Sequence, residues 1–176
     1  MLFRSDSALD KVGQYVLKKR GKEFREGTFA DVIANDERVL NGPGINVPCL
    51  SISRYPYPEY HTTDDNLDIM HEDKLQEAAD VIEEIIRVYA TDYLPKRKFR
   101  GPVFLSGHGL FVDWQVNWKL NRAIEKMMMR FEGKQSVFEI ADELDLDYWE
   151  TREYIEKFRV RGLVEALPLP EVAEKE

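Results

Sequence analysis

The chain has 176 residues, of which 43% are hydrophobic and 33% charged, a composition typical of globular proteins rather than disordered or fibrous ones. Its formal net charge is −8, and a negative protein repels phosphate backbones and anionic lipids, so we expect neither nucleic acid nor a membrane surface as a partner. The single cysteine, Cys49, excludes an internal disulfide and cysteine-rich zinc modules, and it favours a reducing, cytoplasmic location. No apolar run is long enough for a membrane span, and the first residues lack the apolar region of a signal peptide.

The N-terminal part shows one clear helix and two β-prone segments. The helix is expected to begin after a cap at Asp6 or Ser7 and to end at Gly21. Residues 23–29 are short and mixed, which predicts an edge strand. Residues 47–53 (VPCLSIS) predict a second short strand, buried ahead of the loop that follows it.

Residues 73–93 carry the clearest helical pattern of the sequence, because apolar side chains recur there at helical spacing. They are expected to form one wide apolar stripe of Leu75, Ala78, Ala79, Ile82, Ile85, Ile86, Tyr89 and Tyr93. Pro95 is expected to stop the helix, and the basic residues 96–100 are the expected boundary between two units. Two short strands are predicted next, at 102–105 and 110–112.

The last third has a different pattern, with helices expected at 119–131, 137–144 and 148–159. Ser136 and Asp147 are suitable N-caps for the second and third of these helices. A strand-like segment follows at 162–165. This order of elements is typical of a winged helix-turn-helix: a helix, a short helix, a tight turn, a helix and a strand.

The charges of this unit argue against DNA binding. Its third helix mixes acids and bases: Glu150, Glu153 and Glu156 with Arg152, Lys157 and Arg159. The unit also has more aromatic residues than a small three-helix core needs: Phe131, Phe138, Tyr148, Trp149, Tyr154 and Phe158. Trp114 and Trp118 are four residues apart, so we expect them to share a face and to dock against protein.

Residues 54–68 have neither helical nor strand periodicity, and they carry three tyrosines, a histidine and four acids. A neutral imidazole is a good zinc ligand, and a nearby carboxylate can accept its other N–H and fix its tautomer. His61 is therefore a candidate ligand, with Asp64, Asp65 and Asp68 as candidate partners. Tyr60 could stabilise an oxyanion. The alternative is a surface loop rich in turn-forming residues with an incidental histidine.

The sequence NDERVLNGPGINVPCLSISRYPYPEYHTTDDNLD, residues 35–68, resembles the C-terminal catalytic end of zinc aminopeptidases of the M28 type. It is more closely similar to bacterial aminopeptidase-like proteins of the DUF4910 type. Those proteins carry Asp-Glu-Arg, Pro-Gly and then Pro-Glu-Tyr-His-Thr-Ser-x-Asp-Asn-Leu-Asp, with a winged helix near the C-terminus. The resemblance covers residues 8–168, and Thr63 stands where those proteins usually have serine.

The resemblance implies a role for each matching residue. His61 would be the last of the zinc ligands. Tyr60 would line the substrate carbonyl or stabilise the tetrahedral intermediate. Asp36 would lie behind the metal ligands, and Asp65 would support the loop or orient His61. Glu37 matches the closer relatives and completes, with Tyr60 and Asp36, the set of candidate catalytic residues.

The same resemblance implies that part of the metal site is missing. The family's other ligands, a His, an Asp, a Glu-Glu pair and another acid, lie upstream of the matching region. His71 and His108 are interpreted as a helix-start residue and a turn residue. We therefore expect a C-terminal fragment that has no peptidase activity alone and binds zinc weakly at best. Its expected partners are the missing N-terminal part of the same domain and, in the full-length relative, a peptide or amide substrate; a homo-oligomer stays open.

These observations predict the α/β class. Residues 1–95 would be the C-terminal part of a mixed-sheet, zinc-peptidase-like domain, and 96–116 a connector with short strands. Residues 117–168 would be a winged helix-turn-helix, and 169–176 a tail. The full-length relative would hydrolyse an amide, with zinc polarising the carbonyl and activating water. The alternative is a non-enzymatic helix-turn-helix protein with a binding or regulatory role.

Overall fold

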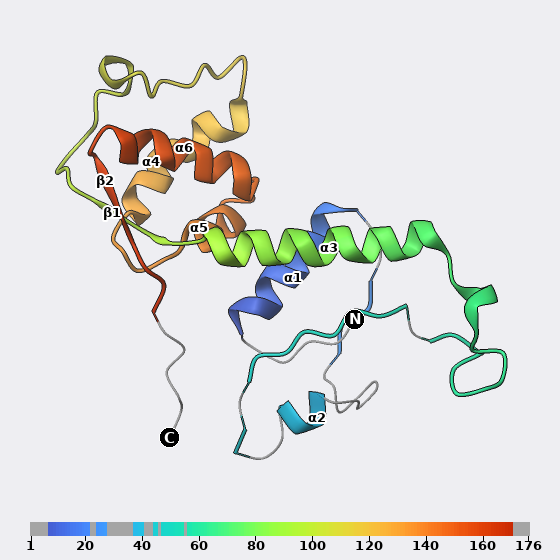
Figure 1. Cartoon of the computed structure of the whole chain (residues 1–176). Coiled ribbons are helices and arrows are strands. Elements are labelled where there is room, and N and C mark those ends of the chain that lie inside the picture. The colour runs from blue at the N-terminus through green and yellow to red at the C-terminus, as the bar shows by residue number, and fades with distance from the viewer. Residues whose placement is uncertain are drawn as a thin grey trace. The chain divides into compact units, whose positions relative to one another are not determined.

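The structure, a computed structural model, is mostly helical and has one small two-stranded sheet, so it belongs to the mixed α and β class (Figure 1). The chain divides into two compact units, Met1–Ala90 and Thr91–Glu176. The residues that the structure describes are 7–21, 24–27, 37–40, 44–45, 47–54 and 56–170.

Helix α1, Ala8–Lys19, opens the first unit and confirms the predicted cap and stop. Ser7 and Asp10 form a capping box, in which the Ser7 hydroxyl accepts the Asp10 N–H at 3.1 Å and the Asp10 carboxylate accepts the Ser7 N–H at 3.2 Å. At the other end Gly21 has φ +63°, a left-handed conformation that a glycine adopts without strain. Both ends of α1 are therefore set by local chemistry.

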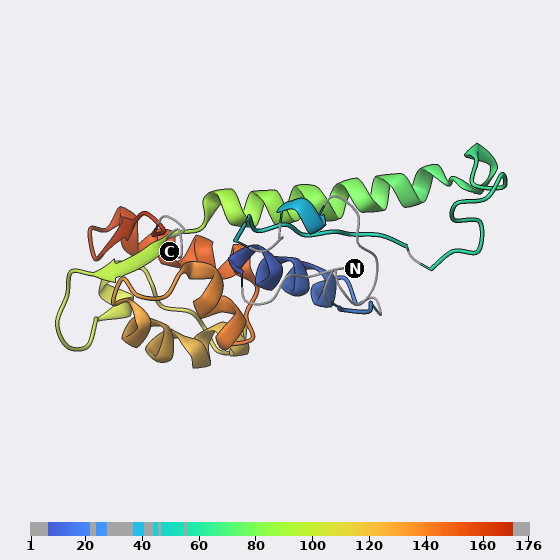
Figure 2. The same ribbon diagram turned by 90° about the horizontal axis from the view of Figure 1, so that it is seen from below.

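The described part of the first unit holds three further helical segments: α2 at Glu37–Leu40, the 3-10 turn η1 at Leu67–Ile69, and α3 at Glu72–Thr91. The first hydrogen bonds of α3 run from the N–H groups of Lys74 and Leu75 to the carbonyl of His71. Helix α1 crosses α3 in the view of Figure 1 and lies alongside it in Figure 2, and the Arg20 guanidinium donates to the Glu84 carboxylate at 3.0 Å. This ion pair ties the C-terminal end of α1 to α3.

The single wide apolar stripe predicted for α3 is wrong, because the apolar residues of this helix lie on two faces. Val81, Ile85 and Val88 are buried. Four of the residues assigned to the stripe are exposed instead: Leu75, Ile82, Ile86 and Tyr89. Tyr93 lies beyond the end of the helix.

The mixed sheet predicted for residues 1–95 is not formed by the part of the first unit that the structure describes. Residues 47–54 are extended, with only an isolated bridge at Ser51, and residues 24–27 have no regular structure. The remainder of the predicted strand at 23–29 lies outside the described residues. A β-prone segment becomes a strand only when a second strand accepts and donates its backbone hydrogen bonds.

The described part of the second unit contains both strands of the sheet, one 3-10 turn and three α-helices: β1 at Leu94–Arg97, η2 at Leu105–His108, α4 at Trp118–Arg130, α5 at Val137–Glu143, α6 at Tyr148–Val160 and β2 at Val164–Leu167. Strands β1 and β2 are antiparallel, with Leu94 opposite Leu167 and Arg97 opposite Val164. The predicted helices and the strand-like end of this region are confirmed, with shifts of at most two residues at their ends.

The caps of α5 and α6 are also those predicted. Ser136 and Glu139 form a capping box at α5, and the Asp147 carboxylate accepts the Glu150 N–H at 2.9 Å at α6. Asp145 lies in the turn between these helices with φ +53°, a left-handed conformation for which aspartate is one of the tolerant residues. The tight connection between α5 and α6 is thus encoded within a few residues.

The core of the second unit includes a cluster of aromatic rings. Phe158 packs edge-on against Phe131 and Tyr154, with ring centroids 5.6 and 5.4 Å apart. Phe131, Phe138, Tyr148, Tyr154 and Phe158 are all buried, and Trp149 is half-buried. The predicted surplus of aromatic residues is therefore wrong for this group, since the core accommodates the rings.

The connector between β1 and α4 has no strands, so the two predicted at 102–105 and 110–112 are corrected. The buried Tyr154 hydroxyl donates to the carbonyl of Leu110 at 2.8 Å, and the Asn121 amide donates to the carbonyl of Val112, also at 2.8 Å. Side chains rather than a neighbouring strand therefore satisfy the backbone of this segment.

Candidate functional site

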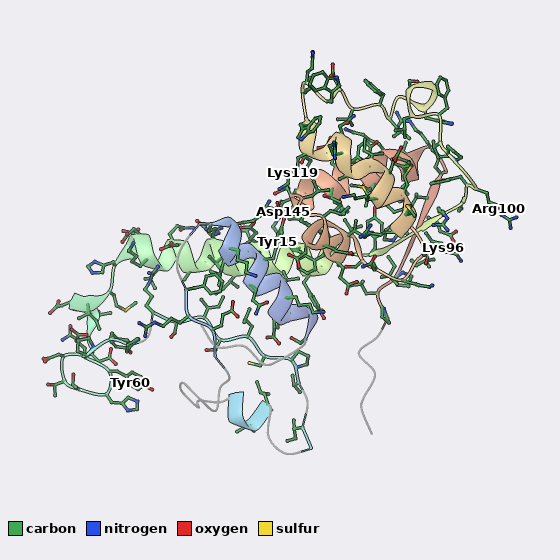
Figure 3. All side chains as sticks on the ribbon, turned by 180° about the vertical axis from the view of Figure 1, so that it is seen from behind. Tyr15, Tyr60, Lys96, Arg100, Lys119 and Asp145 are labelled. Atoms are coloured by element: carbon green, nitrogen blue, oxygen red, sulfur yellow. The ribbon has the colours of Figure 1, made fainter. Side chains whose placement is uncertain are left out.

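The tyrosine-rich loop predicted to carry the site is a series of short turns, and hydrogen bonds between residues of the loop itself hold these turns together. The Thr62 N–H and hydroxyl both donate to the Glu59 carbonyl, at 3.0 and 2.7 Å, and the Asp65 N–H donates to the Thr62 carbonyl at 3.2 Å. Tyr60 lies on this loop, beyond the N-terminal end of α3 (Figure 3). The loop conformation is therefore fixed by residues 57–68 themselves.

His61 is an exposed residue of this loop and has φ +61°, in the left-handed region. That conformation is uncommon outside glycine and costs a non-glycine residue about 1 kcal/mol. The imidazole stacks on the Tyr60 ring, with centroids 4.0 Å apart and planes 19° from parallel. The prediction of an exposed loop at His61 is confirmed, although no buried strand precedes it in the described residues.

The two aspartates nearest His61 make other contacts. The Tyr57 hydroxyl donates to the Asp65 carboxylate at 3.3 Å. Desolvation and this carboxylate raise the pKa of Tyr57. The Asp64 N–H donates to the Thr62 hydroxyl at 3.2 Å. Asp65 thus supports the loop through Tyr57, and its predicted role in orienting His61 stays a prediction.

Only part of the predicted constellation can be compared with the structure. Tyr60, His61, Asp64 and Asp65 lie in one loop. Asp36 lies outside the described residues. Glu37 is the first residue of α2, and its side chain also lies outside the part that the structure describes. The catalytic roles of Asp36 and Glu37 therefore remain predictions.

The described side chains do not make a metal site on their own. Within the ranges that the structure describes, no three His, Cys, Asp or Glu side chains lie together in a way that could hold a metal ion. Zinc in proteins takes about four ligands, or three with one water. His61 is consequently one candidate ligand without companions in this part of the chain.

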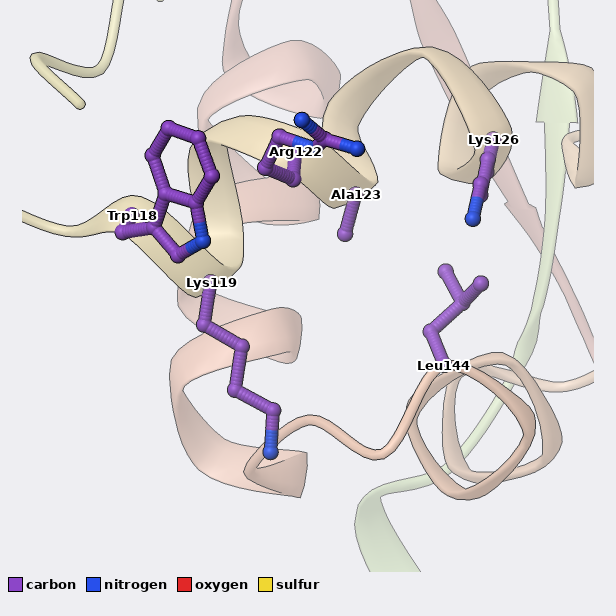
Figure 4. Close-up of a pocket in the computed structure, with 6 residues that line it drawn as sticks. All are labelled: Trp118, Lys119, Arg122, Ala123, Lys126 and Leu144. Atoms are coloured by element: carbon purple, nitrogen blue, oxygen red, sulfur yellow. The ribbon is translucent and has the colours of Figure 1, made fainter.

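A second surface feature surrounds the predicted docking residues Trp114 and Trp118. Their rings meet edge-on with centroids 6.1 Å apart, and the side chains are 55% and 56% exposed. The Arg122 guanidinium lies 5.1 Å from the centroid of the Trp118 ring, within the range of a cation–π interaction. A groove of about 310 Å³ opens here (Figure 4), lined by Trp118, Lys119, Arg122, Ala123, Lys126 and Leu144.

Sequence reasoning missed the basic residues of this groove. Trp118, Arg122 and Lys126 recur every four residues on α4, which places them along one face, so the signal was present in the spacing. The Lys119 ammonium is neutralised by Asp145 at 2.6 Å. The groove therefore combines an aromatic ring with cations at the start of α4, while its use for docking stays a prediction.

Comparison with known proteins gives two relatives, both from Clostridium acetobutylicum. One, described as a "Putative polysaccharide biosynthesis protein with aminopeptidase-like domain", is 29% identical over 157 residues, which cover 81% of this chain and 34% of that protein. The other is a crystal structure described as that of a "putative peptidase", with a TM-score of 0.69 and 23% identity, covering 92% of this chain and 36% of that one. The chain thus spans about a third of the length of each, and the second likeness establishes a shared fold.

No helix in the described part of the chain is both long enough and apolar enough to cross a membrane. The family model described as "Domain of unknown function (DUF4910)" matches residues 3–92, which include α1, α2, the His61 loop and α3. Because this match takes in more than half of the sequence, the chain belongs to the DUF4910 family.

Proposed function

We propose that this chain is part of a zinc-dependent, aminopeptidase-like hydrolase of the M28 type, in which His61 is one of the metal ligands. Membership of the DUF4910 family and the peptidase-like names of its relatives support a hydrolase of this general kind. The observation that carries the proposal is the conformation of His61, which is exposed, left-handed and stacked on Tyr60. A strained backbone that persists in a loop often belongs to a functional site.

The remaining ligands would come from residues outside the described part of the chain, because the described residues gather no ligand cluster. Zinc bound by such a complete set would polarise an amide carbonyl and activate a water molecule. The Tyr60 ring stacks on the imidazole of His61 and so supports its orientation. Asp65 holds Tyr57, which packs edge-on against Tyr60 at 5.5 Å, so the three rings form one supported group.

The test uses a chimera, defined as the Clostridium acetobutylicum relative in which this chain replaces the matching third. We expect it to hydrolyse a peptide-like amide, to lose activity with a chelator and to regain activity with zinc. His61→Asn is the informative variant, because asparagine tolerates the left-handed conformation but does not replace the imidazole as a zinc ligand.

His71→Asn is the matched control, since His71 is also exposed and precedes α3 by one residue. Hydrolysis that survives His61→Asn would show that His61 is not a ligand. Calorimetry on the 176-residue chain alone should detect only weak zinc binding. Tight binding that His61→Asn abolishes would contradict the view that the other ligands lie elsewhere.

We further propose that α4, α5, α6 and β2 form a winged helix-turn-helix that docks against protein rather than DNA. Helix α6 presents the acidic side chains of Glu150 and Glu153 to solvent, which would face a phosphate backbone unfavourably. The exposed Trp114 and Trp118 offer apolar contact area instead.

The second candidate function is that of a non-enzymatic helix-turn-helix protein, and the cationic groove beside Trp118 is the observation that favours it. A fluorescence titration with duplex DNA at low salt separates the two, because low salt strengthens electrostatic binding. We expect no binding. Micromolar affinity that falls steeply with salt and is lost in Arg122→Glu would favour the second candidate.

A further inference from the structure

Helix α3 has three distinct faces. One is buried and consists of Val81, Ile85 and Val88. One is polar and includes Gln76, Glu83 and Arg87. Between them lies a third face of exposed apolar residues, which we name the α3 apolar face: Leu75, Ala79, Ile82, Ile86 and Tyr89.

The spacing of the α3 apolar face makes it continuous. Its members follow one another by four, three, four and three residues, which aligns them along one side of a helix. The line extends over 15 residues, or about 20 Å at 1.5 Å per residue. Leu75, Ile82, Ile86 and Tyr89 are between 42% and 59% exposed. A continuous apolar line of this length marks a surface that another part of a structure covers.

The family match indicates which part of a longer protein that would be. Residues 3–92, matched by the DUF4910 model, contain the whole of α3. The relatives continue well beyond this segment, since the chain covers 34% of one and 36% of the other. The first unit also leaves other apolar side chains exposed: Val39, Leu40, Ile45, Val47, Leu67 and Met70. This pattern fits a portion of a domain that lacks its neighbours.

We propose that the α3 apolar face packs against the remaining two thirds of a longer, aminopeptidase-like DUF4910 chain. The proposal rests on the proposed function, in which this chain is one part of such a protein. The covering surface must be apolar opposite Ile82 and Ile86, because a charge buried there would lack a partner. Tyr89, near the end of the line, can keep its hydroxyl in water at the rim.

A second copy of this chain fits the face less well. A stable pair of proteins buries about 800 Å² on each partner, far more than five half-exposed side chains provide. Two copies of α3 could also pair as a coiled coil, but that arrangement is indicated by an apolar repeat of three or four heptads. The α3 apolar face spans only about two. A segment joined to the same chain needs less contact area, because it loses little translational freedom when it packs.

The first experiment uses the 176-residue chain alone and compares three variants. The double variant Ile82→Glu with Ile86→Glu alters the α3 apolar face, Gln76→Glu adds charge on the polar face as a control, and Ile85→Glu alters the buried face. We expect a monomer by light scattering and an unfolding midpoint that the double variant leaves unchanged, while Ile85→Glu unfolds the first unit. A double variant as damaging as Ile85→Glu, or a dimer that it dissociates, would overturn the proposal.

The second experiment places the same variants in the chimera described above. There the double variant should raise the rate of proteolysis in the native state by at least about tenfold, because it exposes a packed interface, and Gln76→Glu should not. An unchanged rate for the double variant would overturn the proposal. Since this readout is independent of zinc and of hydrolysis, its failure is distinguishable from a failure of the His61 assignment.

Discussion

The two units of the chain treat their apolar residues in opposite ways. In the described part of the second unit, buried large apolar side chains outnumber exposed ones, and the Phe158 ring contacts those of Phe131 and Tyr154. Among the described residues of the first unit, the buried large apolar side chains are fewer than the exposed ones: Val12, Tyr15, Val16, Val81, Ile85 and Val88.

Regular helices do not by themselves make a complete core. Helices α1 and α3 are as regular as α4 and α6, and α1 has a capping box as good as that of α5. Stability comes chiefly from burial of apolar area. Among the described residues, the second unit therefore buries its large apolar side chains more completely than the first.

The largest expected effect is a difference between two matched core substitutions. Ile155 in the second unit is fully buried, and Ile155→Ala should cost about 2–5 kcal/mol of unfolding free energy. Ile85 in the first unit is 4% exposed, and Ile85→Ala should cost less, about 1–2 kcal/mol, because a thin core can collapse around the change.

Denaturant unfolding followed by tryptophan fluorescence reports the second unit, since all three tryptophans lie there. Hydrogen exchange of the α1 and α3 amides reports the first. Val160→Ala is the control for an exposed site, because Val160 is 79% exposed, and it should change the free energy by less than about 0.5 kcal/mol. Equal losses of unfolding free energy in Ile155→Ala and Ile85→Ala would contradict the inferred difference between the two cores.

A smaller effect is expected at the two capping boxes. Ser136→Ala should cost about 1 kcal/mol in urea unfolding, because it removes the acceptor of the Glu139 N–H. Ser7→Ala should only fray the first turn of α1, which hydrogen exchange detects. Ser136→Thr and Ser7→Thr keep an acceptor and serve as controls. A global loss of stability in Ser7→Ala would show that the first unit is more cooperative than we infer.

The smallest effect concerns an exposed ion pair of the second unit. Hydrogen bonds from Arg130 and Gln135 lower the pKa of Glu143 to about 2. A lowered folded-state pKa means that the contribution to stability is present above the ordinary value of 4.5 and is lost as the pH falls toward 2. An NMR titration of Glu143 should show the low value, and Arg130→Gln should raise it. An unchanged titration in that variant would assign the shift to another cause.

Local chemistry explains why the helices could be predicted from the sequence. Ser7, Gly21, Ser136 and Asp147 act on their own helix ends, through hydrogen bonds to the nearest turn or through a left-handed conformation. Such signals need no information about the rest of the fold.

Pairing explains why the strand predictions other than that of β2 failed. Residues 102–105 and 110–112 have β-prone composition but no partner strand. The true strand β1 contains Pro95, which the sequence favours as a helix stop. Proline is tolerated there because β1 belongs to a sheet of two strands, where one edge needs no N–H donor; the Pro95 carbonyl still accepts the Gly133 N–H at 2.9 Å.

The candidate site was likewise predictable only in part. The exposure of His61 followed from a loop rich in turn-forming residues, but its left-handed backbone and its stacking on Tyr60 arise from how successive turns fit together. The stripe of α3 was misassigned for a related reason. Periodicity identifies apolar residues, while only a partner surface decides which of them are buried.

The connector between β1 and α4 is held at both ends, and this has a consequence for how relatives can differ in length. Its start is fixed by the Lys98 N–H, which donates to the Leu163 carbonyl at 2.8 Å, and its later part by the bonds of Tyr154 to Leu110 and of Asn121 to Val112. An insertion or deletion near Leu110 would move a carbonyl away from a buried phenol. Changes of length are therefore expected to accumulate in residues 99–104, where neither end has to move, and to be rare in residues 108–112.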